Sequence, residues 1–404
     1  MPRYSPLVKH WLLDEKTTFI NHGSYGACPK IVLEAQNQLR QTLEMQPVKF
    51  FLHTLLPKMD EVRECLGNFL STDAQNIALI PNATQGVNTI LRAHPLKPGD
   101  EILVTNHGYN ACNNAAAFIA KERGLTVTVA NLPFPIHSTG QITDAIEAAL
   151  TPKTKLAIID HITSPTALVT PIQTIVELLN HAGVDTIVDG AHAPGQIDID
   201  LESIGCAYYT GNCHKWLCTP KGSAFLYVRD DKQNNIRPLA ISHGANAPTQ
   251  ERSFFRNEFD WQGTHDPTAH MVIPRAIESI ATWAEGGWEE IQNQNRNLAI
   301  KARDLLCDAL EVPKPCPDEL IATMAALPLN GNVLPGGFPN AGLQKILIED
   351  YQIEVPVFDQ PYSPVKTIRI SAQLYNDLSQ YEYLADALKQ VQARHGIKLG
   401  FIND

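Results

Sequence analysis

The chain has 404 residues, of which 44% are hydrophobic and 19% charged, and its formal net charge is -11. This composition is typical of a globular protein and excludes disordered, coiled-coil and collagen-like chains. Acidic residues outnumber basic ones by 43 to 32, and no basic run interrupts the chain, so we expect no nucleic-acid partner. No segment approaches the ~18 uncharged apolar residues that span a bilayer, and the N-terminus lacks a signal-peptide core. We therefore expect no membrane partner and a cytoplasmic location.

Short apolar β-rich runs alternate with helical patterns between residues 77 and 228. Several runs are apolar along most of their length, as in strands that are buried on both faces. The alternation predicts an α/β fold with a mostly parallel seven-stranded sheet covered by helices on both sides. The expected strands are residues 77–80, 101–105, 125–130, 155–160, 184–189, 207–211 and 223–228, and the expected helices are residues 84–92, 110–123, 144–150 and 172–181.

The pattern changes near residue 266, where a helix-rich stretch, a proline cluster and mixed short strands follow. We interpret residues 1–19 as an N-terminal arm, 20–266 as a large domain and 267–404 as a smaller α+β C-terminal domain. The glycine- and proline-rich stretch 330–340 is expected to be a mobile flap. Within the small domain, the expected strands are residues 320–327, 353–357 and 367–371, and a closing helix is expected over 379–394.

Asp189 and Lys215 are the residues that indicate chemistry most directly. Asp189 ends an apolar strand and Lys215 follows the next one, so both are expected at the carboxyl edge of the sheet, where open α/β sheets bind ligands. Pyridoxal phosphate chemistry needs such a pair, because the lysine forms a Schiff base and the carboxylate keeps the pyridine nitrogen protonated. Alone, such an aspartate is more often a cap and such a lysine a surface charge. Together with His192 they favour a catalytic site.

A phosphate site is expected where Ala83 and Thr84 open a helix directly after the first predicted strand of the sheet. Unpaired amides and the helix dipole favour an anion there, and the Thr84 hydroxyl adds a donor. Taken alone, the segment is more simply an N-terminal cap. With Lys215 at the same sheet edge, phosphate binding becomes the favoured interpretation.

Eight segments, in order, resemble the class V aminotransferase family of fold type I pyridoxal phosphate enzymes. The resemblance covers nearly the whole chain and is strongest to the isopenicillin N epimerase-like branch. It implies the PLP-dependent transferase fold type I and pyridoxal 5'-phosphate as the cofactor. The segments are FINHGSYGACP (19–29), PNATQGVNT (81–89), NHGYNA (106–111), SPTALVTPI (164–172), VDGAHAPG (188–195), GNCHKWL (211–217), WQGTHDPTA (261–269) and IRISAQLYN (368–376).

The resemblance also implies roles around the cofactor. Lys215 is then the Schiff-base lysine, Asp189 the partner of the pyridine nitrogen, and His192 a neighbour of the phenolic oxygen. Tyr109 resembles the aromatic residue that stacks on the ring. Ser164 stands where many members of the family carry an asparagine near the cofactor.

Further implied contacts concern the phosphate and the subunit arrangement. Asn212 and His214 are expected beside the phosphate. Gly263 and Thr264 are expected to reach in from a second subunit, which implies a homodimer with shared active sites.

Arg369 is the expected ligand of the substrate carboxylate, since a planar guanidinium binds both oxygens at once. Its alternative role is an ion pair, and the match of its segment to the family favours substrate binding. Asn21 and His22 are expected to border the same pocket. The alternative is that they only stabilise the turn in which they lie. His107, His161 and His192 have no partner at ligand spacing, so no metal site is expected.

The implied function is an enzyme acting at the α-carbon of an amino acid or a derivative, with Lys215 as the general base. Return of the proton to the opposite face gives epimerisation, which needs a second acid or base, and Tyr25 and His22 are the candidates. C–S lysis by β-elimination and transamination are alternatives, and a non-catalytic cofactor-binding protein is a remote one. Desulfurase chemistry is disfavoured, because the small-domain cysteines, Cys307 and Cys316, do not lie in its expected loops.

Overall fold

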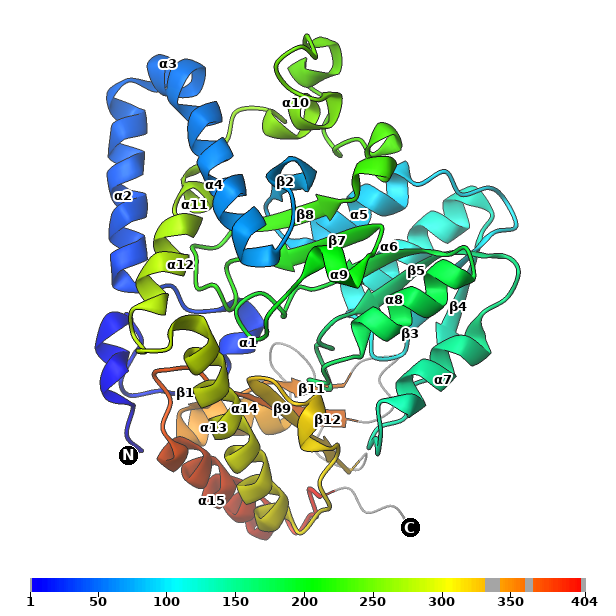
Figure 1. The fold of residues 1–404 in the computed structure, drawn as a ribbon. Helices are drawn as coiled ribbons and strands as arrows, with labels where there is room; N and C mark the ends of the chain where they lie inside the picture. Colours follow the sequence, from blue (N-terminus) through cyan, green and yellow to red (C-terminus); the bar gives the residue numbers. More distant parts are fainter. Residues whose placement is uncertain (1, 331–341, 360–365, 401–404) are drawn as a thin grey trace.

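A computed structural model describes residues 2–330, 342–359 and 366–400 of the chain (Figure 1). The expected flap at 330–340 therefore lies, apart from its first residue, outside the described residues. Within these ranges, no helix is both long and apolar enough to cross a lipid bilayer. All eight cysteines are free thiols.

The large domain is built on a seven-stranded sheet with the order β2-β8-β7-β6-β5-β3-β4. Only β8 runs antiparallel to its neighbours, so the predicted mostly parallel sheet is confirmed. Each strand starts within one residue of its predicted position. The strands are β2 (Ile77–Ile80), β3 (Glu101–Thr105), β4 (Thr126–Ala130), β5 (Thr154–Asp160), β6 (Asp185–Asp189), β7 (Tyr208–Asn212) and β8 (Ala224–Val228).

Helices cover both faces of this sheet (Figure 1). Successive strand residues alternate between two hydrophobic clusters, as the period of two requires: Ile187 of β6 lies in one cluster and Val188 in the other. One cluster includes α5 (Ala83–Ala93) and α6 (Asn110–Arg123). The other includes α7 (Gly140–Ala149) and α8 (Ile172–His181).

Helix α7 begins four residues before the predicted helix. Gly140 and Thr143 are weak helix formers, and the sequence pattern therefore indicated a start at Asp144. Ile142 is buried in the core, and burial of this side chain stabilises the additional turn.

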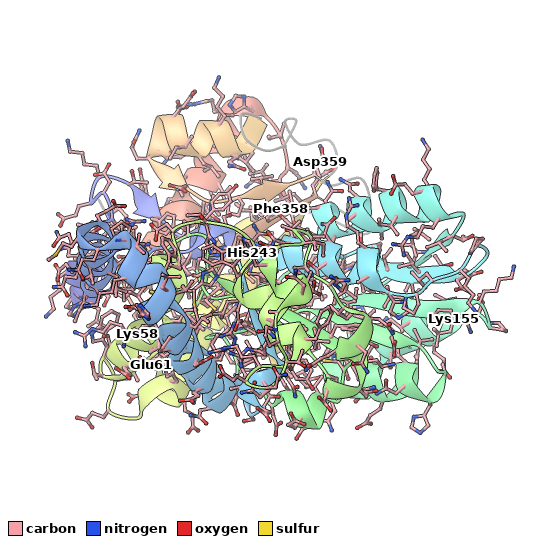
Figure 2. The ribbon with its side chains drawn as sticks, turned by 90° about the horizontal axis from the view of Figure 1, so that it is seen from above. Lys58, Glu61, Lys155, His243, Phe358 and Asp359 are labelled. Carbon is pink, nitrogen blue, oxygen red and sulfur yellow. The ribbon has the colours of Figure 1, made fainter. Side chains whose placement is uncertain are left out.

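A further group of helices packs at the β2 end of the sheet. The helices α11 (Thr268–Met271) and α12 (Ile273–Ala281) pack against α2 (Lys30–Met45) and α4 (Leu55–Leu70). Lys58 and Glu61 form an ion pair on the exposed side of α4 (Figure 2). The first helices after residue 266 thus contact the first long helices of the chain. Two short helices, α3 (Pro47–Lys49) and α10 (Phe254–Asp260), complete this region.

The C-terminal region contains a three-stranded antiparallel sheet with the order β11-β12-β9. Near it, β1 (Thr18–Phe19) of the N-terminal arm pairs in parallel with β10 (Ile353–Glu354). The predicted strand 353–357 is thus two strands with different partners, separated at Pro356, which lacks a backbone donor. The other elements are β9 (Met324–Leu329), β11 (Val357–Phe358), β12 (Lys366–Ser371), α13 (Gly287–Leu310), α14 (Gly342–Tyr351) and α15 (Leu378–His395).

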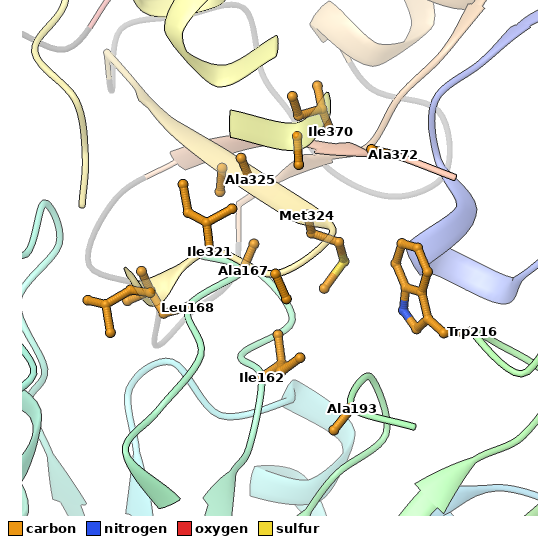
Figure 3. Packing of buried hydrophobic residues seen from close by; sticks show 14 of the residues in the cluster. Ile162, Ala167, Leu168, Ala193, Trp216, Ile321, Met324, Ala325, Ile370 and Ala372 are labelled. Carbon is orange, nitrogen blue, oxygen red and sulfur yellow. The ribbon is translucent and has the colours of Figure 1, made fainter. Parts of the chain in front are cut away.

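Apolar packing is continuous between the two sheets. Ile162 and Leu168, in the loop after β5, lie in one hydrophobic cluster with Ile321, Met324 and Ile370 of the C-terminal region (Figure 3). This contact places β12 against the carboxyl edge of the large sheet, where the candidate site residues gather.

Candidate active site

Lys215 lies in the turn after β7 and is 9% exposed. Its Nζ is 3.0 Å from Nε2 of His192. The N-terminal turn packs closely on this loop, because Gly26 has φ +73° and a Cβ there would lie 2.1 Å from the carbonyl oxygen of His214. Burial, followed by the charge of Arg369, lowers the pKa of Lys215 to about 7. A neutral amine is therefore available near neutral pH.

Asp189 ends β6 and is buried beside this lysine loop. Its Oδ1 accepts the backbone N–H of Ala191 at 3.0 Å, and its Oδ2 accepts the thiol of Cys112 at 3.2 Å. Burial raises the pKa of Asp189, and these hydrogen bonds and Lys215 partly offset the rise. The carboxylate is thus held in a fixed orientation at the end of its strand.

His192 is buried, and its neutral imidazole faces Lys215. Burial, then the charges of Lys215 and Arg369, lower its pKa well below the usual range. Its Nδ1 has no hydrogen-bond partner within the described part of the chain. Because buried polar atoms are nearly always hydrogen-bonded, this nitrogen indicates that a bound group completes the site.

The start of α5 brings Ala83 and Asn212 together, with the amide of Ala83 donating to Oδ1 of Asn212 at 2.9 Å. Asn82 caps the helix by accepting the amide of Gln85 at 2.9 Å. Thr84 is half-buried in the first turn. These residues form a helix N-terminus at the sheet edge, which suits an anion such as a phosphate.

His214, on the same loop as Lys215, donates from Nδ1 to the carbonyl of Ser223 at 3.0 Å. Burial lowers its pKa to about 4, with Lys215 adding to the effect. Its neutral ring can therefore use Nε2 toward a ligand without adding a charge.

Arg369 of β12 is 1% exposed and makes contacts only to uncharged groups in the described residues. Its Nη1 donates to the carbonyl and the hydroxyl of Ser164 at 2.6 and 3.2 Å, and its Nη2 donates to the hydroxyl of Ser24 at 3.4 Å. Its guanidinium lies 4.8 Å from the ring centre of Phe358. Burial lowers its pKa to about 9. A buried cation without a carboxylate partner is suited to bind an anionic ligand.

Lys215 and Arg369 line one cavity of about 350 Å³. Tyr109, at the start of α6, and Tyr25 line it too and are 39% and 59% exposed. Phe358 and Asp359 form its small-domain side (Figure 2). The remaining lining residues are Gly23, Ser24, Asn110, Ala111, Asn114, Ser164, Gln344, Pro356 and Val357.

Two predicted pocket residues lie behind the cavity wall. His22 is fully buried, with Nδ1 2.8 Å from the Tyr375 hydroxyl and Nε2 2.9 Å from the carbonyl of Lys215. It supports the lysine loop and does not line the cavity. Asn21 accepts the Ser24 hydroxyl at 2.6 Å, and Ser24 in turn contacts Arg369.

Gly263 and Thr264 do not line the Lys215 cavity of their own chain. They line a second cavity of about 320 Å³, together with Pro81 and Gln85 near the start of α5 and with His270. Their expected contribution to a site in another subunit stays a prediction.

Two residues that sequence reasoning missed contact the site from neighbouring elements. Cys112 reaches Asp189 from α6, and nothing in the local sequence indicated this contact. Asp160 ends β5 in register with Asp189. It has the same sequence signal as Asp189, an aspartate that ends an apolar strand, and could have been found by applying that criterion to every strand. No group of three or more metal-ligating side chains occurs in the described ranges.

These features together fit pyridoxal phosphate. Lys215 offers a neutral buried amine, Asp189 a fixed carboxylate, and the first turn of α5 an anion site. The unpartnered Nδ1 of His192 and Nε of Arg369 leave polar atoms for the cofactor and the substrate.

Comparison with known proteins agrees with this geometry. The family described as Aminotransferase class-V matches residues 27–324. The chain is 32% identical to isopenicillin N epimerase of Amycolatopsis lactamdurans, over 94% of this chain and 96% of that protein. It is 29% identical to a probable chloroplastic L-cysteine desulfhydrase of Arabidopsis thaliana, over 94% of this chain and 83% of that protein.

Solved structures show the same fold. The cysteine desulfurase CsdA of Escherichia coli superposes with a TM-score of 0.76 at 18% identity, covering 96% of this chain and 98% of that chain. The cystine C–S lyase C-DES superposes with a TM-score of 0.75 at 20% identity, covering 92% and 97%. These likenesses support the predicted fold type.

Proposed function

The chain belongs to the aminotransferase class-V family of enzymes, and from this premise we propose that it is a pyridoxal 5'-phosphate enzyme that removes the α-proton of an amino acid. The observation that carries the proposal is one cavity that contains a buried lysine amine, Lys215, and a buried guanidinium, Arg369, which has no carboxylate partner among the described residues. One group suits proton removal and the other suits the substrate carboxylate.

The cofactor, when bound, supplies an electron-withdrawing ring that stabilises negative charge at the α-carbon. In this proposal Asp189 faces the ring nitrogen, Tyr109 stacks on the ring and His192 lies by the phenolic oxygen. Ser164 orients Arg369 by accepting two hydrogen bonds from its Nη1. The phosphate is held by Ala83, Thr84, Asn212 and His214.

Arg369 positions the substrate, and Lys215 moves the proton. Ser164, Ser24 and Phe358 hold the guanidinium in one plane, so the bound carboxylate has a defined orientation. Lys215 Nζ, whose pKa of about 7 leaves a substantial neutral fraction near neutral pH, takes the proton from the α-carbon. The resulting ammonium is favoured by the nearby acids, since the charge of Asp189 raises the pKa of Lys215.

Epimerisation is the first candidate outcome, and it requires an acid on the face opposite Lys215. Of the two predicted candidates, His22 uses both ring nitrogens behind the lysine loop. Tyr25 lines the cavity and is therefore the group we assign to this step. Similarity to isopenicillin N epimerase supports this candidate.

Cleavage of a carbon–sulfur bond by β-elimination is the second candidate, and it requires fewer groups from the cavity lining than epimerisation does. Elimination needs no second base, because the electron pair of the broken Cα–H bond expels the sulfur substituent. Asp359 is the one carboxylate within the described lining, and it forms an ion pair with Lys366 at 3.1 Å. It is therefore not assigned as a second base. Similarity to L-cysteine desulfhydrases supports this candidate.

The test is to offer the purified protein D- and L-amino acids and S-substituted cysteines. Loss of optical rotation reports epimerisation, pyruvate release reports elimination, and another 2-oxo acid reports transamination. Lys215→Ala should lower the rate by at least ~10³-fold. Lys221→Ala is the matched control, because Lys221 lies on the same loop but binds the carbonyl of Gly26 at 2.9 Å. Equal rates in the two variants would refute the proposal.

Tyr25→Phe separates the two candidate outcomes. Removal of its hydroxyl should abolish epimerisation while leaving β-elimination within a few-fold of wild type. Equal effects on both reactions would remove Tyr25 from the proposed acid role.

A homodimer with shared sites is part of the proposal, with Gly263 and Thr264 of one copy serving the site of the other. Mixing inactive Lys215→Ala protein with a Thr264→Ala variant tests this. Hybrid dimers then hold one site with both residues intact, and activity should rise above the sum of the two variants. A monomer by light scattering, or no gain on mixing, would contradict shared sites.

A further inference from the structure

Two buried carboxyl groups lie side by side at the carboxyl edge of the large sheet. Asp160 ends β5 and Asp189 ends β6, and their Cα atoms are register partners in the parallel pair. Register partners in adjacent strands project side chains on the same face. Their residues are 4% and 2% exposed. No ion pair of the described residues includes either carboxyl, so this arrangement differs from an ordinary salt bridge.

Helix α6 covers this pair with two donors from its first turn. The backbone N–H of Tyr109, the residue that precedes the helix, points to the carboxyl of Asp160 closely enough to lower its pKa. Cys112, one turn further, donates its thiol to Asp189 Oδ2 at 3.2 Å. Asp160 therefore links the proposed ring-stacking residue to the carboxylate proposed for the ring nitrogen.

Two adjacent buried carboxyls cannot both ionise readily, since like charges at short range disfavour the second ionisation. Burial, then the charge of Asp189, raises the pKa of Asp160 well above its usual range. Four other titratable groups face the pair among the described residues: Lys215 from the loop after β7, the Cys112 thiol from α6, and the hydroxyls of Tyr109 and Tyr209. Lys215 favours one negative charge on the pair, and the thiol hydrogen bond directs that charge to Asp189.

We propose that Asp160 is a positioning residue that works as a neutral carboxylic acid, holding Tyr109 in place and leaving Asp189 as the single ionised carboxylate at the cofactor ring. The inference rests on the proposed roles of Asp189 and Tyr109 and extends them to a residue outside the cavity lining. Asp160 acts through these two residues and does not touch the reacting atoms.

The test compares Asp160→Asn with Asp160→Ala in the full-length chain. Asparagine has the shape of a neutral aspartic acid and can still accept the Tyr109 amide, whereas alanine cannot. The readout is the dissociation constant of pyridoxal phosphate from the apoprotein, by absorbance titration. Asp160→Ala should weaken binding about tenfold, and Asp160→Asn should stay within about twofold of wild type near neutral pH.

The pH profile gives the second readout. Raising the pH ionises Asp160 in the wild type, places two charges on the pair and weakens cofactor binding. Asp160→Asn cannot ionise there, so the ratio of wild-type to variant dissociation constants should rise as the pH is raised. Thr186→Val, a buried change on β6 without a titrating group, is the control and should show a flat ratio.

Two results would overturn the inference: Asp160→Asn binding as weakly as Asp160→Ala, or a wild-type to Asp160→Asn ratio that stays flat with pH. If circular dichroism shows that Asp160→Ala does not fold, the inference is tested by the pH dependence of the ratio of wild-type to Asp160→Asn dissociation constants alone. The proposed function fails separately, through Lys215→Ala retaining activity. A flat ratio together with an inactive Lys215→Ala rejects only the role of Asp160.

Discussion

The end of α13 and strand β12 each hold a fully buried arginine, and their surroundings are opposite. Arg303 of α13 pairs through Nε with Asp304 at 2.6 Å and through Nη2 with Asp318, and its Nη1 donates to the carbonyl of Cys316 at 3.1 Å. Arg369 of β12 contacts hydroxyls, a carbonyl and an aromatic ring, with no ion pair among the described residues. One guanidinium is neutralised within the fold, and the other is not.

The two pKa shifts reflect this difference. Burial tends to lower the pKa of Arg303, but the hydrogen bonds of Asp318 and Asp304 outweigh burial and raise it. Burial lowers the pKa of Arg369 to about 9, opposed only by Tyr109. Removing one partner of a buried ion pair is destabilising because the other partner loses its counter-charge, whereas a buried charge without such a partner has a desolvation cost that no ion pair offsets. The same substitution at the two positions should therefore have different consequences.

Of the substitutions that compare the two arginines, Arg369→Met should have the largest effect, and the effect is on catalysis. Losing the carboxylate ligand should lower kcat/KM by about 10²–10³-fold, while the free energy of unfolding stays the same or rises because no ion pair is lost. Steady-state kinetics and urea denaturation measure the two effects. Arg369→Lys keeps the charge but not the planar fork, and should recover only part of the activity. A marked loss of stability in Arg369→Met would show that this arginine is structural.

Arg303→Met should give the reverse result. Removing this guanidinium leaves Asp304, Asp318 and a buried carbonyl without their donor, so the free energy of unfolding should fall by about 2–3 kcal/mol. Because both acids are partly exposed, water limits the loss. The kcat/KM per folded molecule should remain within about twofold. A large drop in kcat/KM with unchanged stability would end the contrast between the two arginines.

How much of this contrast could be predicted from sequence depends on the range of the interactions. Asp189 and Lys215 were predicted because each follows a buried strand, and strand ends are local features. The surroundings of Arg369 were not, since its contact with Ser24 joins residues 345 positions apart. The position of His22 behind Lys215, and the thiol of Cys112 on Asp189, likewise depend on packing between elements. Asp160 had the local signal of Asp189, but no motif drew attention to it.

Lys215→Met extends the comparison to another buried cation, one that has no ion pair within the part of the chain that the structure describes. The pKa of Lys215 is about 7 in the folded chain and 10.5 ordinarily, so the unfolded chain binds the proton over this interval. The contribution of Lys215 to the free energy of unfolding of the wild type therefore falls as the pH drops from 10.5 toward 7. The Met apoprotein should be more stable by about 1–2 kcal/mol near neutral pH.

Thermal unfolding of the two apoproteins at several pH values tests this sign. The difference in Tm should grow as the pH falls toward 7 and then level off. A Met variant less stable than wild type at every pH would mean that Lys215 stabilises the fold, as Arg303 does.

Cys112→Ala gives the smallest expected effect, because it removes a weak neutral donor from a buried carboxylate. The thiol hydrogen bond lowers the pKa of Asp189, so its loss should raise that pKa and weaken pyridoxal phosphate binding only a few-fold, in line with about 0.5–1 kcal/mol for one such bond. Cys112→Ser restores a stronger donor and should bind the cofactor at least as tightly as wild type. Equal weakening in Ala and Ser would mean that Cys112 acts by filling space in α6, because both changes remove the sulfur and only one removes the donor.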